Sequence, residues 1–179
     1  MFNLYFFAMA LLAIAFPAWM RWLSYLNLKH MRSGCPESLK GLYTPEEQGR
    51  ALAFQADGNK FGMASSIVNV CLDLAFLFLG VYGLLEGLTA KVPGGLLAQA
   101  AVMFAALYFW NLLRGLPFGY YYRFGFLQKH GFNRSTKKLF VTDVLKSLPL
   151  GLLEALAEPV GAALLWLLLG RHFWLALWG

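Results

Sequence analysis

The sequence predicts an all-α fold, a polytopic membrane helix bundle with four transmembrane helices and a truncated fifth. Three observations predict this class. Of the 179 residues, 59% are hydrophobic, only 13% are charged, and the apolar residues gather into long runs. The charged share is about half that of a typical soluble domain. A bilayer accommodates so much apolar surface because lipid-facing side chains can be apolar.

Four apolar runs set the expected transmembrane helices, at about residues 2–28, 63–88, 96–113 and 145–169. Each is near or above the ~20 residues that a helix needs to cross about 30 Å of hydrocarbon. Backbone groups in lipid must be hydrogen-bonded within the segment, and the runs lack the alternation of strands, so helices are expected. The last run, 173–178, is too short to span.

Basic residues gather in two of the connections. Residues 21–60 carry six Lys and Arg and residues 114–146 carry seven, whereas the connections on the other side carry only Lys91 and Arg171. The positive-inside rule therefore predicts that both basic connections are cytoplasmic and that the N-terminus lies outside. The expected membrane is a bacterial inner membrane or the endoplasmic reticulum. The net charge of +6 is read as a sign of orientation, and no nucleic-acid partner is expected.

The chain shows no repeat and no low-complexity linker, so residues 1–179 are expected to form a single membrane domain. Its cytoplasmic loops are placed at about 29–60 and 117–144. Within the first loop, Thr44 followed by Glu47 has the spacing of a capping box and predicts a short helix from Pro45 to Ala56. The segment Asp57-Gly58-Asn59 is expected to end that helix before the membrane run begins.

Three acidic residues lie well inside the apolar runs, away from the ends of the runs. Asp73 lies in the second run, and Glu154 and Glu158 are four residues apart in the fourth, so they share one helix face. Ionisable groups at bilayer depth usually face a bundle interior or a water-filled cavity. We therefore expect a hydrated chamber or ion path, a reading that Pro159 favours because it would kink the helix and free a carbonyl. The alternative is that these acids pair with nearby Lys or Arg near the membrane surface.

The residue types of a catalytic metal site are not arranged in this sequence as that chemistry requires. The histidines, His30, His130 and His172, include no pair at i, i+4 and no His-Glu-x-x-His pattern. That pattern places two imidazoles and a glutamate on one helical face. No metal, no cofactor and no catalytic residue is therefore expected in this chain. Cys35 and Cys71 share no metal or redox spacing and are expected to be reduced thiols.

Three segments in the second basic connection form a specific pattern. In order they are Pro117-Phe118-Gly119-Tyr120-Tyr121, Gly131-Phe132-Asn133-Arg134-Ser135-Thr136 and Phe140-Val141-Thr142-Asp143-Val144-Leu145-Lys146. They resemble the N-terminal membrane domain of the type I CAAX prenyl proteases, which carries a Pro-Phe-x-x-Tyr stretch, a Gly-Phe-Asn-x-x-Thr loop and a Phe-x-x-Asp-x-x-Lys helix opening, in the same order. Weaker similarity extends over residues 25–30, 53–61 and 173–178, and the last of these segments resembles the start of the family's fifth helix.

The resemblance implies a zinc endopeptidase family whose membrane helices enclose a hydrated chamber and which cleaves prenylated proteins or membrane-protein segments. The family's His-Glu-x-x-His helix lies beyond the end of this chain, so no catalytic residue carries over. The resemblance adds His130, Asn133, Asp143 and Lys146 to the candidate chamber-facing or substrate-facing residues. Asn133 is expected either to cap the helix that follows or to contact substrate.

The function predicted first is that of a truncated or split protease, in which this chain supplies membrane helices and a separate or missing portion supplies the zinc site. Its expected partners are the lipid bilayer, that catalytic portion and prenylated or membrane-protein substrates. The alternatives are a non-enzymatic membrane scaffold derived from the family and, less favoured, a small ion or solute transporter. A transporter would show an inverted repeat, which the sequence lacks.

Overall fold

The computed structural model describes residues 3–34 and 44–178, and most of these residues are helical. It confirms the all-α membrane fold, because four helical segments are long and apolar enough to cross a membrane: Leu4–Arg32, Pro45–Phe78, Gly95–Leu127 and Lys137–Ala176. The chain divides into two compact units, Met1–Gly80 and Val81–Gly179, here called the N-terminal and C-terminal units. Cys35, predicted to be a reduced thiol, lies outside the described residues.

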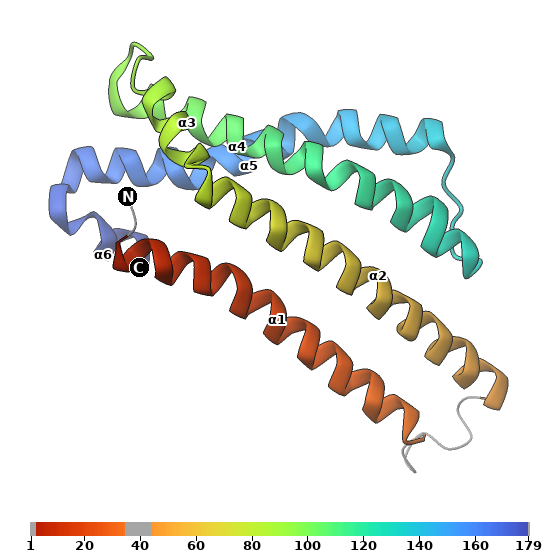
Figure 1. Ribbon diagram of the computed structural model, residues 1–179. Coiled ribbons are helices and arrows are strands. Elements are labelled where there is room, and N and C mark those ends of the chain that lie inside the picture. Colours follow the sequence, from red (N-terminus) through yellow and green to blue (C-terminus); the bar gives the residue numbers. More distant parts are fainter. Residues whose placement is uncertain (1–2, 35–43, 179) are drawn as a thin grey trace. The chain divides into compact units, whose positions relative to one another are not determined.

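The N-terminal unit is a pair of antiparallel helices, α1 (Leu4–Arg32) and α2 (Pro45–Phe78), which lie side by side in Figure 1. At one end the rings of Phe6 and Phe78 meet edge to face, with centroids 5.1 Å apart. Farther along the pair, the Asn59 side-chain amide of α2 donates a hydrogen bond of 3.0 Å to the Ser24 carbonyl of α1. An aromatic contact and a polar contact therefore fix the register of the two helices.

The helix α2 begins where the sequence predicted a helix, but it does not end where the sequence predicted. Thr44 and Glu47 form the expected capping box, with Oγ1 of Thr44 accepting from the Glu47 N–H at 3.2 Å. The predicted break at residues 57–59 is wrong, since α2 continues to Phe78. The polar side chains there are satisfied without interrupting the helix: Asp57 pairs with Lys60 at 3.6 Å, and Asn59 bonds to α1.

The real break in the second apolar run falls at Gly80. Its φ of 68° is left-handed, a conformation that glycine adopts without a Cβ penalty and that commonly ends a helix. The run predicted as one helix over 63–88 is therefore the end of α2 followed by α3 (Val81–Thr89). At 1.5 Å per residue the 34 residues of α2 measure about 51 Å. This exceeds about 30 Å of hydrocarbon, so the polar first turns of α2 extend beyond the membrane.

The C-terminal unit contains the remaining helices. In chain order they are α3, α4 (Gly95–Tyr121), a π-helical segment η2 (Tyr122–Leu127), α5 (Lys137–Leu169), the short η3 (Gly170–His172) and α6 (Phe173–Trp178). The predicted tight turn lies between α3 and α4, with Gly94 and Gly95 at φ values of 108° and 72°. The last helix, α6, has six residues, as expected for a segment too short to span by itself.

The helices α4 and α5 form the second antiparallel pair (Figure 1). The Tyr108 hydroxyl on α4 donates to the Leu148 carbonyl on α5 at 3.2 Å. The same hydroxyl lies so close to Gly151 that a Cβ added there would be 2.7 Å from its oxygen. Glycine at position 151 thus allows the Tyr108 side chain to pack directly against the α5 backbone.

The second predicted loop, 117–144, is mostly helical. The α4–η2 segment passes through Pro117 to Leu127 and the helix continues to Lys129, and α5 already begins at Lys137, so the non-helical connection is confined to residues 130–136. Charged residues therefore mark where these long helices leave the hydrocarbon rather than where they end. The helix α5 likewise continues through Pro149 and Pro159.

Candidate functional site

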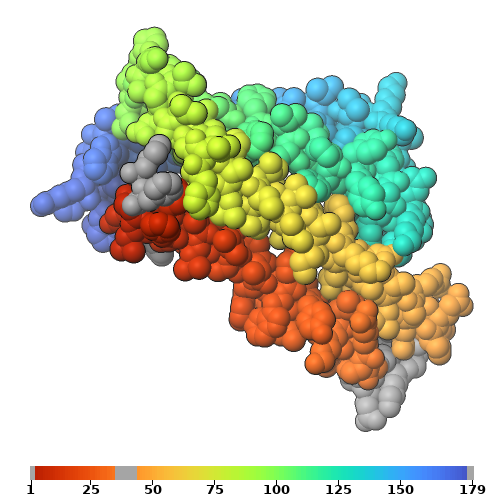
Figure 2. All heavy atoms as spheres, viewed as in Figure 1, coloured from red at the N-terminus to blue at the C-terminus, as the bar shows by residue number. Residues whose placement is uncertain are grey.

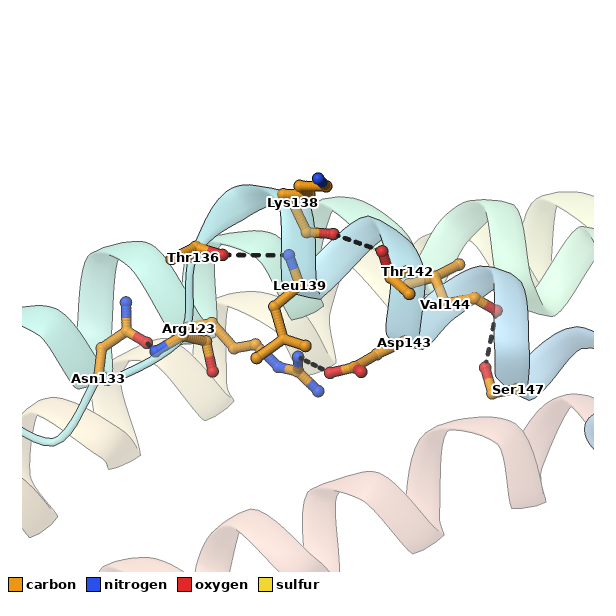
Figure 3. Close-up of polar contacts among 10 residues, drawn as sticks. Arg123, Asn133, Thr136, Lys138, Leu139, Thr142, Asp143, Val144 and Ser147 are labelled. Atoms are coloured by element: carbon orange, nitrogen blue, oxygen red, sulfur yellow. Dashed lines mark hydrogen bonds and ion pairs between the residues drawn. The ribbon is translucent and has the colours of Figure 1, made fainter.

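A set of interacting polar and aromatic side chains in the C-terminal unit lies where η2 faces the start of α5. We call it the η2–α5 cluster, and it consists of Tyr120, Arg123, Phe124, Phe140 and Asp143. Figure 3 shows the Arg123 side chain reaching to Asp143 on α5. The cluster includes residues from two of the three segments that carry the family resemblance.

The segment that carries Arg123 is a π-helix. A π-helix is rare and usually appears as a single turn within an α-helix, often at functional sites. Here Gly125 allows it to pack tightly, because an added Cβ would lie only 3.0 to 3.3 Å from the Tyr121 ring. The wider turn of η2 shifts the side chains after Tyr121 relative to an uninterrupted α-helix.

The Arg123 guanidinium makes two interactions with α5. Its Nη1 donates to Oδ2 of Asp143 at 3.2 Å, and its central carbon lies 5.2 Å from the centroid of the Phe140 ring. The side chains are 36% and 45% exposed, so water screens the ion pair in part. Such a pair is expected to contribute at most about 1 kcal/mol, and the cation–π contact about 0.5–1 kcal/mol when exposed.

Aromatic rings surround this ion pair. Tyr120 and Phe124 stack at a tilt with centroids 4.8 Å apart, and both meet Phe140 edge to face at 5.8 and 5.9 Å. These offset geometries suit the charge distribution of aromatic rings. The cluster joins α4 and η2 to α5 through one ion pair and several ring contacts, which hold these segments in position.

The connection that follows η2 contains His130 and Asn133. The His130 ring lies 5.1 Å from the ring of Phe126, which is 6% exposed, and Gly131 turns the chain with a φ of 76°. Oδ1 of Asn133 accepts from the Ser135 N–H at 2.9 Å, a local turn that leads into α5. Asn133 is therefore a turn residue.

Asn133 does not cap α5, contrary to one of the two roles expected for it. The N-cap is Thr136, whose Oγ1 accepts from the Leu139 N–H at 3.2 Å (Figure 3). The physical reason is distance along the chain: Asn133 lies three residues before the cap, and its amide oxygen is used by the turn. Direct contact of Asn133 with a substrate stays a prediction.

The remaining candidate residues are not members of the η2–α5 cluster. Lys146 is exposed, three residues after Asp143 on α5. Glu154 and Glu158 are also exposed on α5, in the C-terminal unit. Asp73 is half-buried on α2, in the N-terminal unit. Whether these acids face a hydrated chamber stays a prediction.

The described residues bring no three His, Cys, Asp or Glu side chains together in a group that could hold a metal ion. Cys71, the cysteine within the described part, is an exposed free thiol. The side chains present in this part of the chain thus do not provide a zinc-ligand set.

The sequence pattern missed the residues that hold the C-terminal unit together, Arg123, Phe140 and Tyr108. Arg123 carried a signal, since it is a single cation in the aromatic stretch Tyr120-Tyr121-Tyr122-Arg123-Phe124. A cation among rings in a membrane protein requires a partner, and Asp143 was the nearest acid in the next helix. Tyr108 carried no such sequence signal, because its contact with α5 depends on Gly151, 43 residues away.

The helices and the cluster define a polytopic α-helical membrane protein. Comparison with known families identifies it further. The family described as CAAX prenyl protease N-terminal, with five membrane helices, matches residues 24–179. The chain belongs to this family.

Curated relatives agree with the family. The chain is 27% identical over 169 residues to a CAAX prenyl protease 1 homolog of Oryza sativa subsp. japonica, in an alignment covering 87% of this chain. It is 24% identical over 155 residues to the Arabidopsis thaliana homolog, covering 80%, and 27% identical over 164 residues to the Caenorhabditis elegans homolog, covering 89%. These alignments cover 39%, 36% and 36% of the relatives, so the chain spans well under half of their length.

Proposed function

We propose that this chain acts as the membrane-embedded N-terminal portion of a CAAX prenyl protease-like zinc endopeptidase. In this role it forms part of the wall of the reaction chamber and the connections next to it, and a catalytic portion outside these 179 residues supplies the zinc site. The observation that carries the proposal is the match of residues 24–179 to the N-terminal family, together with relatives named as CAAX prenyl proteases.

The η2–α5 cluster supports a wall-forming role. The Arg123–Asp143 pair and the three rings hold η2 against α5 and so position the connection that contains His130 and Asn133. That connection includes the Gly-Phe-Asn segment of the family resemblance. We infer that this face meets the catalytic portion, with the cluster acting through the position of the connection.

The distribution of Lys and Arg supports an orientation. Thirteen of the fifteen basic residues lie in the segments 21–60 and 114–146. By the positive-inside rule these segments are cytoplasmic and the N-terminus is outside. The proposed cytoplasmic side would then carry the connection from η2 to α5, where a prenylated cytoplasmic substrate approaches.

A reconstitution experiment tests the proposal. The purified 179-residue chain is mixed in detergent with the catalytic half of a related CAAX prenyl protease, and cleavage of a prenylated peptide is measured together with bound zinc. Cleavage is expected only in the mixture. Arg123→Gln in this chain should reduce the restored rate, whereas Lys91→Gln, which removes an exposed cation from the turn between α3 and α4, should leave it unchanged.

The outcomes separate an enzyme portion from a scaffold. Cleavage by the mixture and by neither half supports the proposal. A folded chain that binds the catalytic half without restoring cleavage would instead indicate a non-enzymatic membrane scaffold. Circular dichroism and gel filtration of both variants establish that a lost rate does not reflect unfolding.

A further inference from the structure

The N-terminal unit contains a groove between α1 and α2 that the proposed protease role does not use. Two hollows of about 550 and 520 Å³ follow one another along the helix pair and share Arg21, Tyr25, Met63 and Ile67. Each volume falls within the roughly 300–1,000 Å³ of small-molecule sites. Figure 2 shows the outer surface of both helices, α1 in red to orange and α2 in orange to yellow.

One end of the groove is basic. Arg21, Arg32 and Lys60 all line the first hollow. Lys60 is 81% exposed and has Asp57 at 3.6 Å, whereas no ion pair joins Arg21 or Arg32 to another of the described residues. At this end of the groove, the positive charge of the three cations therefore exceeds the negative charge of Asp57.

Arg21 is the cation placed deepest in the groove. It is half-buried, and its guanidinium lies against the Gly62 backbone of α2, where any side chain would displace it. A guanidinium offers several N–H donors in a planar fork that fits phosphate oxygens in a bidentate manner. Glycine at 62 thus allows a half-buried cation to sit at the junction of the two hollows.

The other end of the groove is apolar. Beyond Arg21 the second hollow is lined by apolar side chains, among them Ile14, Pro17, Trp22, Ile67 and Val70. Trp and Tyr near a basic residue are typical of the membrane–water interface, and apolar side chains beyond them face the acyl region. Basic pockets between transmembrane helices on the cytoplasmic side bind the headgroups of anionic lipids.

We propose that this groove binds one anionic phospholipid. Its headgroup phosphate lies at Arg21, with Arg32 and Lys60 adding charge, and one acyl chain runs along the apolar hollow between α1 and α2. Charge complementarity selects this occupant, because a zwitterionic lipid would bring its own cation to the basic end. The bound lipid would compensate the charge of Arg21 from outside the chain.

Native mass spectrometry of the full 179-residue chain tests the proposal. The chain is released from micelles containing equal amounts of dioleoylphosphatidylglycerol and dioleoylphosphatidylcholine, and the retained lipid is identified. Preferential retention of one phosphatidylglycerol is expected. Arg21→Gln should lower this retention about fivefold, the effect of one basic residue near an anionic membrane surface.

Two matched pairs of variants make the result specific. Lys29→Gln removes a cation from the same helix outside the hollows and should leave retention unchanged. An equal loss in Arg21→Gln and Lys29→Gln would overturn the proposal in favour of general surface charge.

The second pair tests the place of the lipid. Ala64→Trp fills the groove without changing charge and should also reduce retention, whereas Val68→Trp, on an exposed position that lines neither hollow, should not. Equal retention of the two lipids by the parent chain would overturn the proposal. Normal retention by Ala64→Trp would also overturn it, because the lipid would then lie outside the groove.

Discussion

The two helix pairs of this chain solve the same packing problem with different side chains. In the N-terminal unit, Gly62 on α2 accepts the flexible end of Arg21 from α1. In the C-terminal unit, Gly151 on α5 accepts the rigid ring of Tyr108 from α4, and the hydroxyl completes the contact by bonding to a backbone carbonyl. A glycine opposite a long side chain allows close approach in both pairs, but only the second contact is rigid.

The arginines differ in the same way. Arg123 is compensated within its unit by Asp143 and by the Phe140 ring, whereas Arg21 has no such ion pair with the described residues. The difference suggests a division of roles. The C-terminal pair is built to hold one geometry, and the N-terminal pair leaves a cation available for an external anion.

The largest expected effect distinguishes the two glycines. Gly151→Val places its Cβ against the Tyr108 hydroxyl and ring, and overpacking of this kind costs about 1–3 kcal/mol. Gly62→Val meets only the tip of Arg21, which can rotate away, so a cost below about 1 kcal/mol is expected. Denaturant unfolding in micelles, followed by circular dichroism, measures both free energies of unfolding.

Removing the obstructing oxygen provides the control for that comparison. Tyr108→Phe should make Gly151→Val less costly in the double variant than in the parent background, because the nearest atom to the new Cβ is the hydroxyl oxygen at 2.7 Å. Equal costs at Gly62 and Gly151 would mean that the Tyr108 contact is no more rigid than the Arg21 contact.

The membrane spans could be predicted from the sequence because length and apolarity alone determine what a bilayer accepts. The ends of the helices could not. Residues 57–59 are predicted as a helix break and residues 117–127 as part of a loop, yet both stretches are helical, and their side chains Asn59 and Arg123 bond to the neighbouring helix. Polarity indicates where a segment meets water and does not indicate whether its backbone stays helical.

The candidate site was predicted in part for a similar reason. Motif resemblance located Asp143 and the loop around Asn133, since these lie within contiguous segments. The partner of Asp143 is Arg123, 20 residues earlier, and the Leu148 carbonyl that Tyr108 contacts lies on the next long helix. Such contacts depend on the register of two helices, which no local pattern of residues specifies.

A smaller effect compares how the long helix of each unit begins. At the start of α2, the Thr44 hydroxyl accepts from the Glu47 N–H, and the Glu47 carboxylate accepts in return from the Thr44 N–H. At the start of α5, Thr136 accepts from the Leu139 N–H without such a return bond. Replacing either threonine by alanine is expected to cost about 1 kcal/mol. Thr44→Ala should be the more costly of the two at neutral pH, because it also removes the hydroxyl bond to the Glu47 carboxylate.

That difference should depend on pH. Hydrogen bonds from the Thr44 backbone N–H and then from its hydroxyl lower the pKa of Glu47, at the polar start of α2, below 4.5. A carboxyl whose pKa is depressed by folding contributes stability above its unfolded pKa and loses it as the pH falls through the folded value. Unfolding measured at pH 7 and pH 3 should therefore show the Thr44→Ala effect shrinking in acid, with no such change for Thr136→Ala.

The smallest effect expected is that of the Arg123–Asp143 pair on stability. Both side chains are more than a third exposed, so a double-mutant cycle with Arg123→Gln and Asp143→Asn should give a coupling energy of about 0.2–1 kcal/mol that falls as salt is added. Arg123→Lys should retain less than half of this coupling, because an ammonium cannot form the planar contact with Phe140 and Asp143 together. A coupling above about 2 kcal/mol would show that the pair is shielded from water in the folded chain. The η2–α5 cluster would then be a buried core of the C-terminal unit, and the contrast with the open groove at Arg21 would be stronger than the exposures of these two side chains indicate.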